Sequence, residues 1–288
     1  MGQAVSGSRV TGSDSRVIGG AASGTSVSTG IRTEVDDRGI ARITIDRPER
    51  MNALNGDASS ALIDFLTTRC AEADIRAVII DGAGGNFSTG ADIRDIAARA
   101  SENGGIDERS AASVIGGGSA LARAVRSVEV PVVASIDGAA VGIGASLAFA
   151  SDLIFATRRS YFLLAFTNIG LMPDGGATAT VSAAIGRPRA NRMVLLGEKL
   201  PAAEAFDAGL ISGLVDDRVA LDAEIAGVAK RFAQSSTQAL RLAKAALDAN
   251  TLAGFESTLE RETSGQTQLL QSDEFQAAIA AFTTARRH

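Results

Sequence analysis

Histidine and cysteine are nearly absent from this chain. The one histidine is His288, the last residue, and the one cysteine is Cys70. A serine–histidine–acid triad needs a histidine held inside the fold, and structural zinc sites use histidine and cysteine ligands. A single cysteine also excludes an internal disulfide framework. We therefore expect no metal site, and any catalysis has to use carboxylates, hydroxyls and backbone amides.

Long apolar runs and an excess of basic residues are lacking as well. No run approaches the roughly 20 residues that a membrane-spanning helix needs. The net charge of −5 argues against nucleic acid or an anionic membrane as the main partner. The single cysteine fits a reducing compartment, so we expect a cytoplasmic protein. A hydrophobic content of 45% over 288 residues is ample for a buried core.

The composition divides the chain into three regions. Residues 1–30 are rich in glycine, serine and threonine and show no periodicity, which predicts a disordered tail. Residues 31–197 carry the strand and glycine-turn patterns described below. Residues 198–288 contain several amphipathic segments and predict a helical C-terminal region that packs on the core or on a neighbouring subunit.

Strands and helices alternate in the second region. Residues 39–47 alternate apolar and polar side chains, which predicts a half-buried strand, and residues 76–84 predict a buried strand that enters a glycine turn. Asn55 is a candidate cap for the helix that follows it. A short apolar helix is expected from about Gly144, and another strand at 152–156. This alternation predicts an α/β core.

Two glycine-rich loops, Gly84–Asp95 and Asp137–Ala148, stand out as candidate ligand sites. A dinucleotide fingerprint is disfavoured because neither loop follows a first strand with an acid about 20 residues further on. Glycines let the main chain approach a ligand closely, so two such turns can direct backbone N–H groups to one point as an oxyanion hole. Two ordinary tight turns remain the alternative.

One carboxylate, Asp174, lies between a proline and two glycines in the segment GLMPDGG. An aspartate before Gly-Gly is a good helix N-cap, and such a cap stabilises by about 1 kcal/mol. The same residue in an apolar pocket is a candidate general base, because burial raises the pKa of a carboxyl group from about 3.9. Both interpretations stand on the residues alone.

Four segments, in this order and spacing, resemble the enoyl-CoA hydratase/isomerase (crotonase) superfamily. They are ITIDRPERMNALN, GNFSTGADIRDI, PVVASIDGAAVGIGASLAFASDLIFA and FLLAFTNIGLMPDGG, and the similarity runs from about Ile31 to the C-terminal SDEFQAAIAAF. The resemblance implies an α/β spiral of ββα repeats with a C-terminal helical trimerisation region, and therefore a homotrimer or hexamer. It also implies an acyl-CoA thioester as substrate, with coenzyme A as part of that substrate and no separate cofactor.

The resemblance also assigns site residues. The two oxyanion donors fall on the backbone N–H groups of Ala91 and Ile143. The segment Met51–Leu54 and the residues around Arg94 match stretches that line the coenzyme A groove, where Arg94 and Arg50 are candidates for the phosphates. The implied substrate-binding residues are Met51, Ala53, Asp92, Ile93, Arg94, Gly142 and Phe166, with Phe166 in the acyl pocket.

Hydration in this family commonly uses two glutamates, and the matching positions here are Ser146 and Phe166. A serine without a partner base and a phenylalanine cannot replace them. The segment around Asp174 is similar to Δ3,Δ2-enoyl-CoA isomerases and to ring-opening isomerases of phenylacetyl degradation. We therefore expect conversion of 3-enoyl-CoA to 2-enoyl-CoA with Asp174 as the single base. The alternatives are an acyl-CoA binder without catalysis, and another reaction of the family such as weak hydration, thioester hydrolysis or ring opening in fatty-acid or aromatic-acid catabolism.

Overall fold

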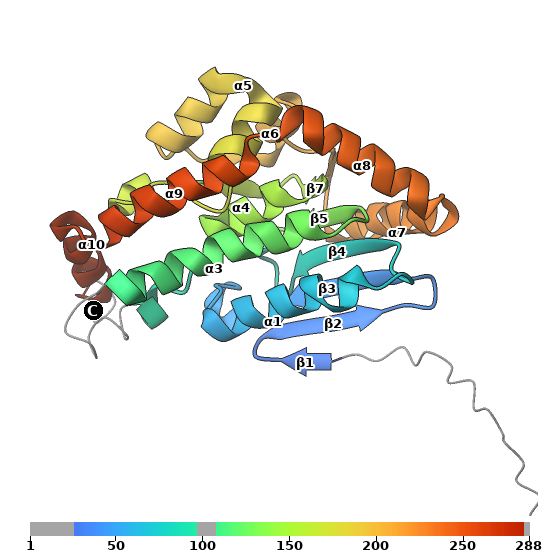
Figure 1. Ribbon diagram of the computed structural model, residues 1–288, viewed down its shortest axis with the longest axis horizontal. Coiled ribbons are helices and arrows are strands. Elements are labelled where there is room, and N and C mark those ends of the chain that lie inside the picture. The colour runs from blue at the N-terminus through green and yellow to red at the C-terminus, as the bar shows by residue number, and fades with distance from the viewer. Residues whose placement is uncertain (1–25, 97–107, 285–288) are drawn as a thin grey trace, which may run out of the picture.

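The computed structural model describes residues 26–96 and 108–284 and shows a mixed α/β fold (Figure 1). The larger sheet has seven strands in the order β1-β2-β3-β4-β5-β7-β10 among the described residues. Its first two pairings are antiparallel, and those from β3 to β10 are parallel. The strands are β1 (Ser26–Ser28), β2 (Ile31–Val35), β3 (Ile40–Ile45), β4 (Ala77–Gly82), β5 (Val132–Ile136), β7 (Leu153–Thr157) and β10 (Gly213–Val215).

A smaller sheet makes the chain a spiral. It contains β6 (Ala139–Val141), β8 (Tyr161–Leu163) and β9 (Leu200–Pro201) in the order β6-β8-β9. Strand β5 of the large sheet is followed directly by β6 of the small one, and β7 is followed in the same way by β8. These two passes of the chain therefore add one strand to each sheet before a helix follows.

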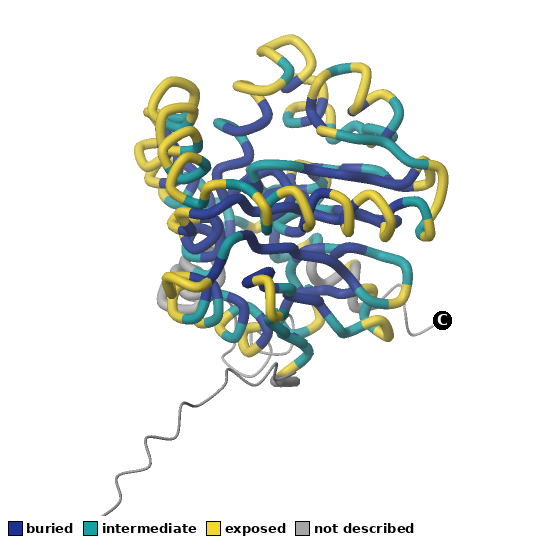
Figure 2. The backbone as a smooth tube through the Cα atoms, turned by 90° about the vertical axis from the view of Figure 1, so that its right-hand side faces the viewer, coloured by how far each residue is buried: buried dark blue, intermediate teal, exposed yellow. Residues whose placement is uncertain are grey.

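The helices enclose both faces of the large sheet. Alternate residues of β4 point to opposite sides: Val78 and Ile80 pack in the main core, whereas Ala77 and Ile79 pack against α7. Such a doubly covered strand is typical of parallel sheets. Figure 2 shows the buried strands between exposed outer helices. The helices are α1 (Gly56–Thr67), α3 (Glu108–Ser127), α4 (Ile143–Ala150), α5 (Ala177–Leu195), α6 (Ala202–Asp207), α7 (Arg218–Gln234), α8 (Thr237–Thr251), α9 (Phe255–Leu270) and α10 (Asp273–Thr284), with short 3-10 turns at η1 (Pro48–Arg50), η2 (Arg69–Ala71) and η3 (Thr167–Ile169).

Several local predictions are confirmed. The side chain of Asn55 accepts a hydrogen bond from the amide of Ala58 at 2.9 Å and caps α1. Strands β3, β4 and β7 lie within one or two residues of their expected bounds, and α4 begins at Ile143. In the part of the chain that the structure describes, no helix has the length and apolarity to cross a membrane.

Two boundaries differ from the sequence-based expectation. Residues 1–25 of the expected tail lie outside the described residues, but Ser26–Ser28 form β1, an edge strand that pairs with β2. Helix α5 begins at Ala177, before residue 198, where the helical C-terminal region was expected to begin. It bends at Gly186, which has a φ of 71°, so Pro188 lies just after a break and not within a continuous helix.

Candidate active site

The two glycine loops lie against each other. Ser88 of the first loop pairs with Ala140 of β6, and the amides of Phe87 and Ser88 both donate to the carbonyl of Ala139 at 3.0 Å. The amide of Val141 donates back to the carbonyl of Ser88 at 2.9 Å. The loops predicted from sequence to converge are therefore joined by backbone hydrogen bonds.

Gly90 brings the candidate oxyanion donors together. It has a φ of +90°, and a Cβ placed on it would lie 2.7 Å from the carbonyl oxygen of Val141 and 3.3 Å from the amide nitrogen of Ile143. Only glycine permits both the left-handed backbone and this close approach. Ala91 follows directly in the chain, so its amide lies beside that of Ile143.

Neither of these amides is used by the fold. Among the described residues, no hydrogen bond is donated by the backbone nitrogen of Ala91 or of Ile143, and both residues are partly exposed. Ile143 is the first residue of α4, where the helix dipole adds positive potential. Two free donors of this kind, one of them at the N-terminus of a helix, can stabilise an oxyanion by several kcal/mol.

A turn with left-handed backbone lies against the first glycine loop, where the hydroxyl of Ser88 donates to the carbonyl of Asn52. Met51 and Asn52 have φ values of 51° and 58°. The side chain of Asn52 holds the turn, because it accepts from the amide of Arg47 and donates to the carbonyls of Ala83 and Asn86. Met51 is left 47% exposed, whereas Ala53 is buried.

Asp92 is occupied by the loop itself. Its carboxylate pairs with Arg47 at 3.2 Å, and the amide of Arg94 donates to it at 3.3 Å. Asp92 is buried, Ile93 is half-buried and the side chain of Arg94 is exposed. We therefore assign to Asp92 the ordering of this loop, while Ile93 and Arg94 remain accessible.

Asp174 lies in the turn that leads into α5, and its carboxyl group is buried. Gln266 of α9 donates to Oδ2 through its Nε2 at 3.2 Å, whereas Oδ1 has no hydrogen-bond partner in the described part of the chain. Burial raises the pKa of Asp174 to about 7, and the negative charge of Glu262 acts in the same direction. The hydrogen bond from Gln266 opposes that shift.

The interpretation of Asp174 as a helix cap is wrong. The N-cap residue of α5 is Gly176, and no side chain of its own turn caps the helix. Glu262 of α9 does so instead: its carboxylate accepts from the amides of Gly176 at 2.7 Å and Thr178 at 3.0 Å, and from the hydroxyl of Thr178 at 2.6 Å. Glu262, a second buried acid, thus caps α5, and the carboxylate of Asp174 is not used for capping.

The carboxyl group of Asp174 lies close to the candidate oxyanion turn, by which we mean Gly90–Ala91 together with Gly142–Ile143. A Cβ placed on Gly118 of α3 would be 3.2 Å from Asp174 Oδ2 and 3.1 Å from Ile143 Cδ1. These two side chains therefore meet at the same point of α3. The ring of Phe166 lies on the other side of the turn, with its Cζ 3.9 Å from the Cβ position of Gly142. The acid and the ring of Phe166 thus each lie against a residue of the segment Gly142–Ile143.

The two hydratase positions carry no acid. Ser146 is fully buried, and its hydroxyl donates to the backbone carbonyl of Asp174 at 2.8 Å. Phe166 is buried in the main core. Ser146 therefore supports the turn of Asp174 and has no proton to exchange with a ligand.

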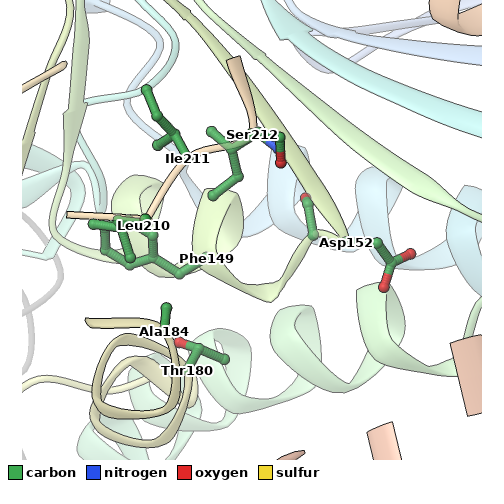
Figure 3. Close-up of a pocket in the computed structure, with 10 residues that line it drawn as sticks. Phe149, Asp152, Thr180, Ala184, Leu210, Ile211 and Ser212 are labelled. Carbon is green, nitrogen blue, oxygen red and sulfur yellow. The ribbon is translucent and has the colours of Figure 1, made fainter. Parts of the chain in front are cut away.

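A separate cavity of about 280 Å³ lies at the other end of α4. Figure 3 shows Phe149 with Leu210 and Ile211 on one side of it, and Thr180 and Ala184 of α5 on another. No candidate site residue lines this cavity. It lies between α4, α5 and the segment before β10 and opens to the surface, where Ala184 and Gly209 are exposed.

Sequence reasoning missed Gln266, Glu262 and Gly118. A signal for the first two exists in α9, where Leu259, Glu262, Gln266 and Leu270 recur every three or four residues and are all buried. A polar pair within an apolar stripe indicates side chains with partners in the core. Gly118 belongs to a run of three glycines, Gly116–Gly118, inside a helix, which is unfavourable for helix stability unless space is needed.

The α/β fold carries two free amides in its glycine loops, and similarity to known proteins identifies the family. The model of the enoyl-CoA hydratase/isomerase family matches residues 36–288, and the chain belongs to that family, which is part of the crotonase superfamily. A probable enoyl-CoA hydratase from Rhodobacter capsulatus is 36% identical over 256 residues, which cover 89% of this chain and 95% of the relative.

Two further relatives agree with this assignment. The 1,2-epoxyphenylacetyl-CoA isomerase of Escherichia coli is 30% identical over 255 residues, covering 87% of this chain and 94% of the relative. The crystal structure of an enoyl-CoA hydratase from Mycobacterium avium subsp. paratuberculosis matches with a TM-score of 0.79 and 36% identity over 89% of this chain and 96% of that one. The expected family and fold are confirmed, while relatives with both names leave the reaction open.

Proposed function

We propose that this protein is an enoyl-CoA isomerase that converts a 3-enoyl-CoA to the conjugated 2-enoyl-CoA. The single observation that supports this most is the buried carboxyl group of Asp174. Its Oδ1 has no hydrogen-bond partner among the described residues, and its Oδ2 lies with the side chain of Ile143, whose amide is free, at Gly118. Moving a double bond requires one base, and the hydratase positions Ser146 and Phe166 offer none.

In the proposed reaction one carboxyl group, that of Asp174, carries out both proton transfers. The thioester oxygen accepts hydrogen bonds from the amides of Ala91 and Ile143, which acidifies the α-carbon. Asp174 removes the α-proton, and the electron pair spreads over the dienolate, whose oxygen the two amides stabilise. Asp174 then returns the proton to the γ-carbon. A pKa of about 7 suits both halves, because the group has to accept and release a proton near neutral pH.

The remaining candidate residues have supporting roles in this proposal. Ile93 and Arg94 follow Ala91 in its loop, and Met51 and Ala53 precede Leu54, which pairs with Ala91. All four are proposed to contact coenzyme A. Gly142 and Phe166 border the acyl group. Coenzyme A enters as part of the substrate, and no separate cofactor is required.

The test is turnover of a 3-enoyl-CoA, followed by the absorbance of the conjugated 2-enoyl thioester. Asp174→Asn should reduce kcat by roughly 10²- to 10⁴-fold, the usual contribution of a general base, while acyl-CoA binding is retained. Unchanged turnover in the variant would exclude Asp174 as the base. Binding without any turnover by the wild type would favour a non-catalytic binder, and efficient hydration of a 2-enoyl-CoA would favour a hydratase.

A second candidate is the isomerisation of an epoxide carried by a phenylacetyl thioester. The similarity to the 1,2-epoxyphenylacetyl-CoA isomerase over most of both chains favours it. The same two amides and the same acid would serve that reaction. Including an epoxyphenylacetyl-CoA in the substrate panel separates the two candidates by their kcat/KM values.

We also propose that the protein is a homotrimer or hexamer. Large apolar side chains are exposed at the end of α5, on α6 and on α8, and α8 has no buried residue in this single chain. Association would cover them, since contiguous apolar surface marks interaction sites. These side chains are Leu195, Leu196, Phe206, Leu242 and Leu247. Light scattering on the purified protein measures the assembly mass, and a monomer would refute this proposal.

A further inference from the structure

Helix α9, in the C-terminal region of the chain, reaches the candidate site. It lies along α3 and beside the start of α5 (Figure 1). Its inward face carries Glu262 and Gln266, which are 1% and 2% exposed and one helical turn apart. Glu262 caps α5, as described above, and Gln266 is directed at Asp174. The helix therefore contributes polar side chains to the site as well as apolar contacts.

Two polar atoms at this contact have no partner. Gln266 Nε2 donates to Asp174 Oδ2 at 3.2 Å, while Gln266 Oε1 and Asp174 Oδ1 are both buried without a hydrogen bond among the described residues. Buried polar atoms are normally paired, so an exception calls for a functional explanation. For Oδ1 the explanation follows from the proposed reaction, since the oxygen that takes the proton has to be free. The amide occupies the other oxygen and thereby selects which one reacts.

We propose that Gln266 is the positioning residue of Asp174: it holds Oδ2 so that Oδ1 is the oxygen that receives and returns the proton. This inference rests on the proposed function. Gln266 touches Asp174 and not the reacting atoms, so it acts through the acid. A primary amide suits this task because it can donate to an ionised carboxylate and, after turning about its last bond, accept from the protonated form. The unpartnered Oε1 is the acceptor that the protonated acid needs.

The groups around Asp174 define what loss of Gln266 should do. From α9, Glu262 is the charged group that acts on Asp174 among the described residues, and it raises the pKa. From α4, Ser146 donates to the backbone carbonyl and not to the carboxylate. From α3, Gly118 presents no side chain. Gln266 is thus the side chain that stabilises the ionised carboxylate, and its removal should raise the pKa of Asp174 above about 7.

The experiment replaces Gln266 by methionine, which has a similar length and no hydrogen-bonding amide. Gln268→Met is the matched control, because Gln268 lies on the same helix and is exposed. In Gln266→Met we expect kcat to fall at least tenfold with a smaller change in KM. The apparent pKa in the pH profile of kcat/KM should rise by about one or more, as expected for loss of a hydrogen bond to a charged group. The control should resemble the wild type in both.

A second readout is independent of turnover. The carboxyl carbon of Asp174 is followed by NMR in protein labelled at aspartate, with Asp174→Asn to assign the signal. The same upward change in pKa in Gln266→Met supports the contact even if the enzyme has another reaction. An unchanged pKa and unchanged kcat in a folded Gln266→Met protein overturn the inference. If this variant does not fold, Gln266→Asn, one carbon shorter, is judged by the same two criteria.

The two proposals fail in different ways. Full activity of Asp174→Asn refutes the isomerase mechanism, whatever the NMR titration of Gln266→Met shows. Loss of activity in Asp174→Asn together with wild-type behaviour of Gln266→Met refutes only the role of Gln266.

Discussion

Ser146 donates its hydroxyl hydrogen bond to the backbone carbonyl of Asp174 at 2.8 Å. Ser146 is on α4, and the first residue of that helix is Ile143, whose amide is one of the two free donors. The proposed base and one candidate oxyanion donor are thereby attached to the same buried helix. A core element, and not a surface loop, holds these two groups relative to each other, which is the preorganisation that the proposed enolate needs.

Stability should depend on the charge of Asp174. The pKa is about 7 in the folded chain and 3.8 in the reference state, so the folded protein binds the extra proton between these values. Ionisation of Asp174 therefore lowers the free energy of unfolding. The stability that the protonated carboxyl group contributes is complete below pH 4 and is lost as the pH rises through 7. Relative to Asp174→Asn, the free energy of unfolding of the wild type should fall by on the order of 4 kcal/mol across this window. Urea denaturation of both proteins at several pH values measures it, and parallel curves would contradict the assignment.

Glu262 should influence both stability and the pH profile. In Glu262→Gln one carboxylate oxygen is replaced by an amino group that faces the amides of α5, so we expect a loss of about 1–3 kcal/mol in the free energy of unfolding. Removal of the negative charge should also lower the pKa of Asp174, which moves the rising limb of kcat/KM to lower pH. This is opposite to the change expected for Gln266→Met.

Glu260→Gln is the control for this prediction, because Glu260 lies on the same helix and is exposed. It should leave both the urea midpoint and the pH profile unchanged. A profile for Glu262→Gln that coincides with that of the control would show that the charge of Glu262 does not reach Asp174.

Gly118 and its neighbour Gly117 should respond differently to alanine. Both lie inside α3, where alanine is more favourable than glycine by about 1 kcal/mol. A Cβ on Gly117 meets nothing within 4 Å, whereas one on Gly118 lies 3.2 Å from Asp174 Oδ2 and 3.1 Å from Ile143 Cδ1. Gly117→Ala should raise the melting temperature by a few degrees, while Gly118→Ala should lose most of that gain and reduce kcat. Equal kinetics in the two variants would show that the space beside Asp174 is not needed.

Gly90→Ala should disable the oxyanion turn. The new Cβ would lie 2.7 Å from the carbonyl of Val141 in a backbone with a φ of +90°, so the loop has to move away from β6. We expect kcat to fall by roughly 10²-fold or more, comparable to loss of one oxyanion donor. Gly209→Ala is the control for backbone strain alone. Gly209 has a φ of +80°, but a Cβ placed on it meets nothing within 4 Å, so no loop has to move. This variant should lose about 1 kcal/mol of stability and keep its activity.

Much of this arrangement could be predicted from sequence because its signals are local. Asn55 caps the helix that it precedes, the apolar residues of β4 mark a buried strand, and the glycines of both loops mark close backbone approach. Asp174 could be named, but its two interpretations could not be separated. Whether it caps a helix depends on what else meets that helix, and the answer is Glu262, which is 88 residues further along the chain.

The partners of Glu262 and Gln266 could not be predicted because they depend on packing. A polar pair within the apolar stripe of α9 indicates that the two side chains have partners in the core, but no motif around them says which. Their role follows from the contact of α9 with α3 and α5, which brings together segments that are far apart in the sequence. Asp92 is a different case: the resemblance implied contact with a ligand, and the structure shows an ion pair with the nearby Arg47.

Gln266 and Glu262 follow both glycine loops and Asp174 in the sequence, and this order has a consequence for biosynthesis. During translation the two oxyanion loops and Asp174 leave the ribosome well before α9 does. Until α9 docks, the start of α5 lacks the carboxylate that covers its amides, and the acid lacks the amide that restrains it. A nascent chain would therefore present both glycine loops before Asp174 has its side-chain partner, and the proposed reaction would begin only after α9 has docked.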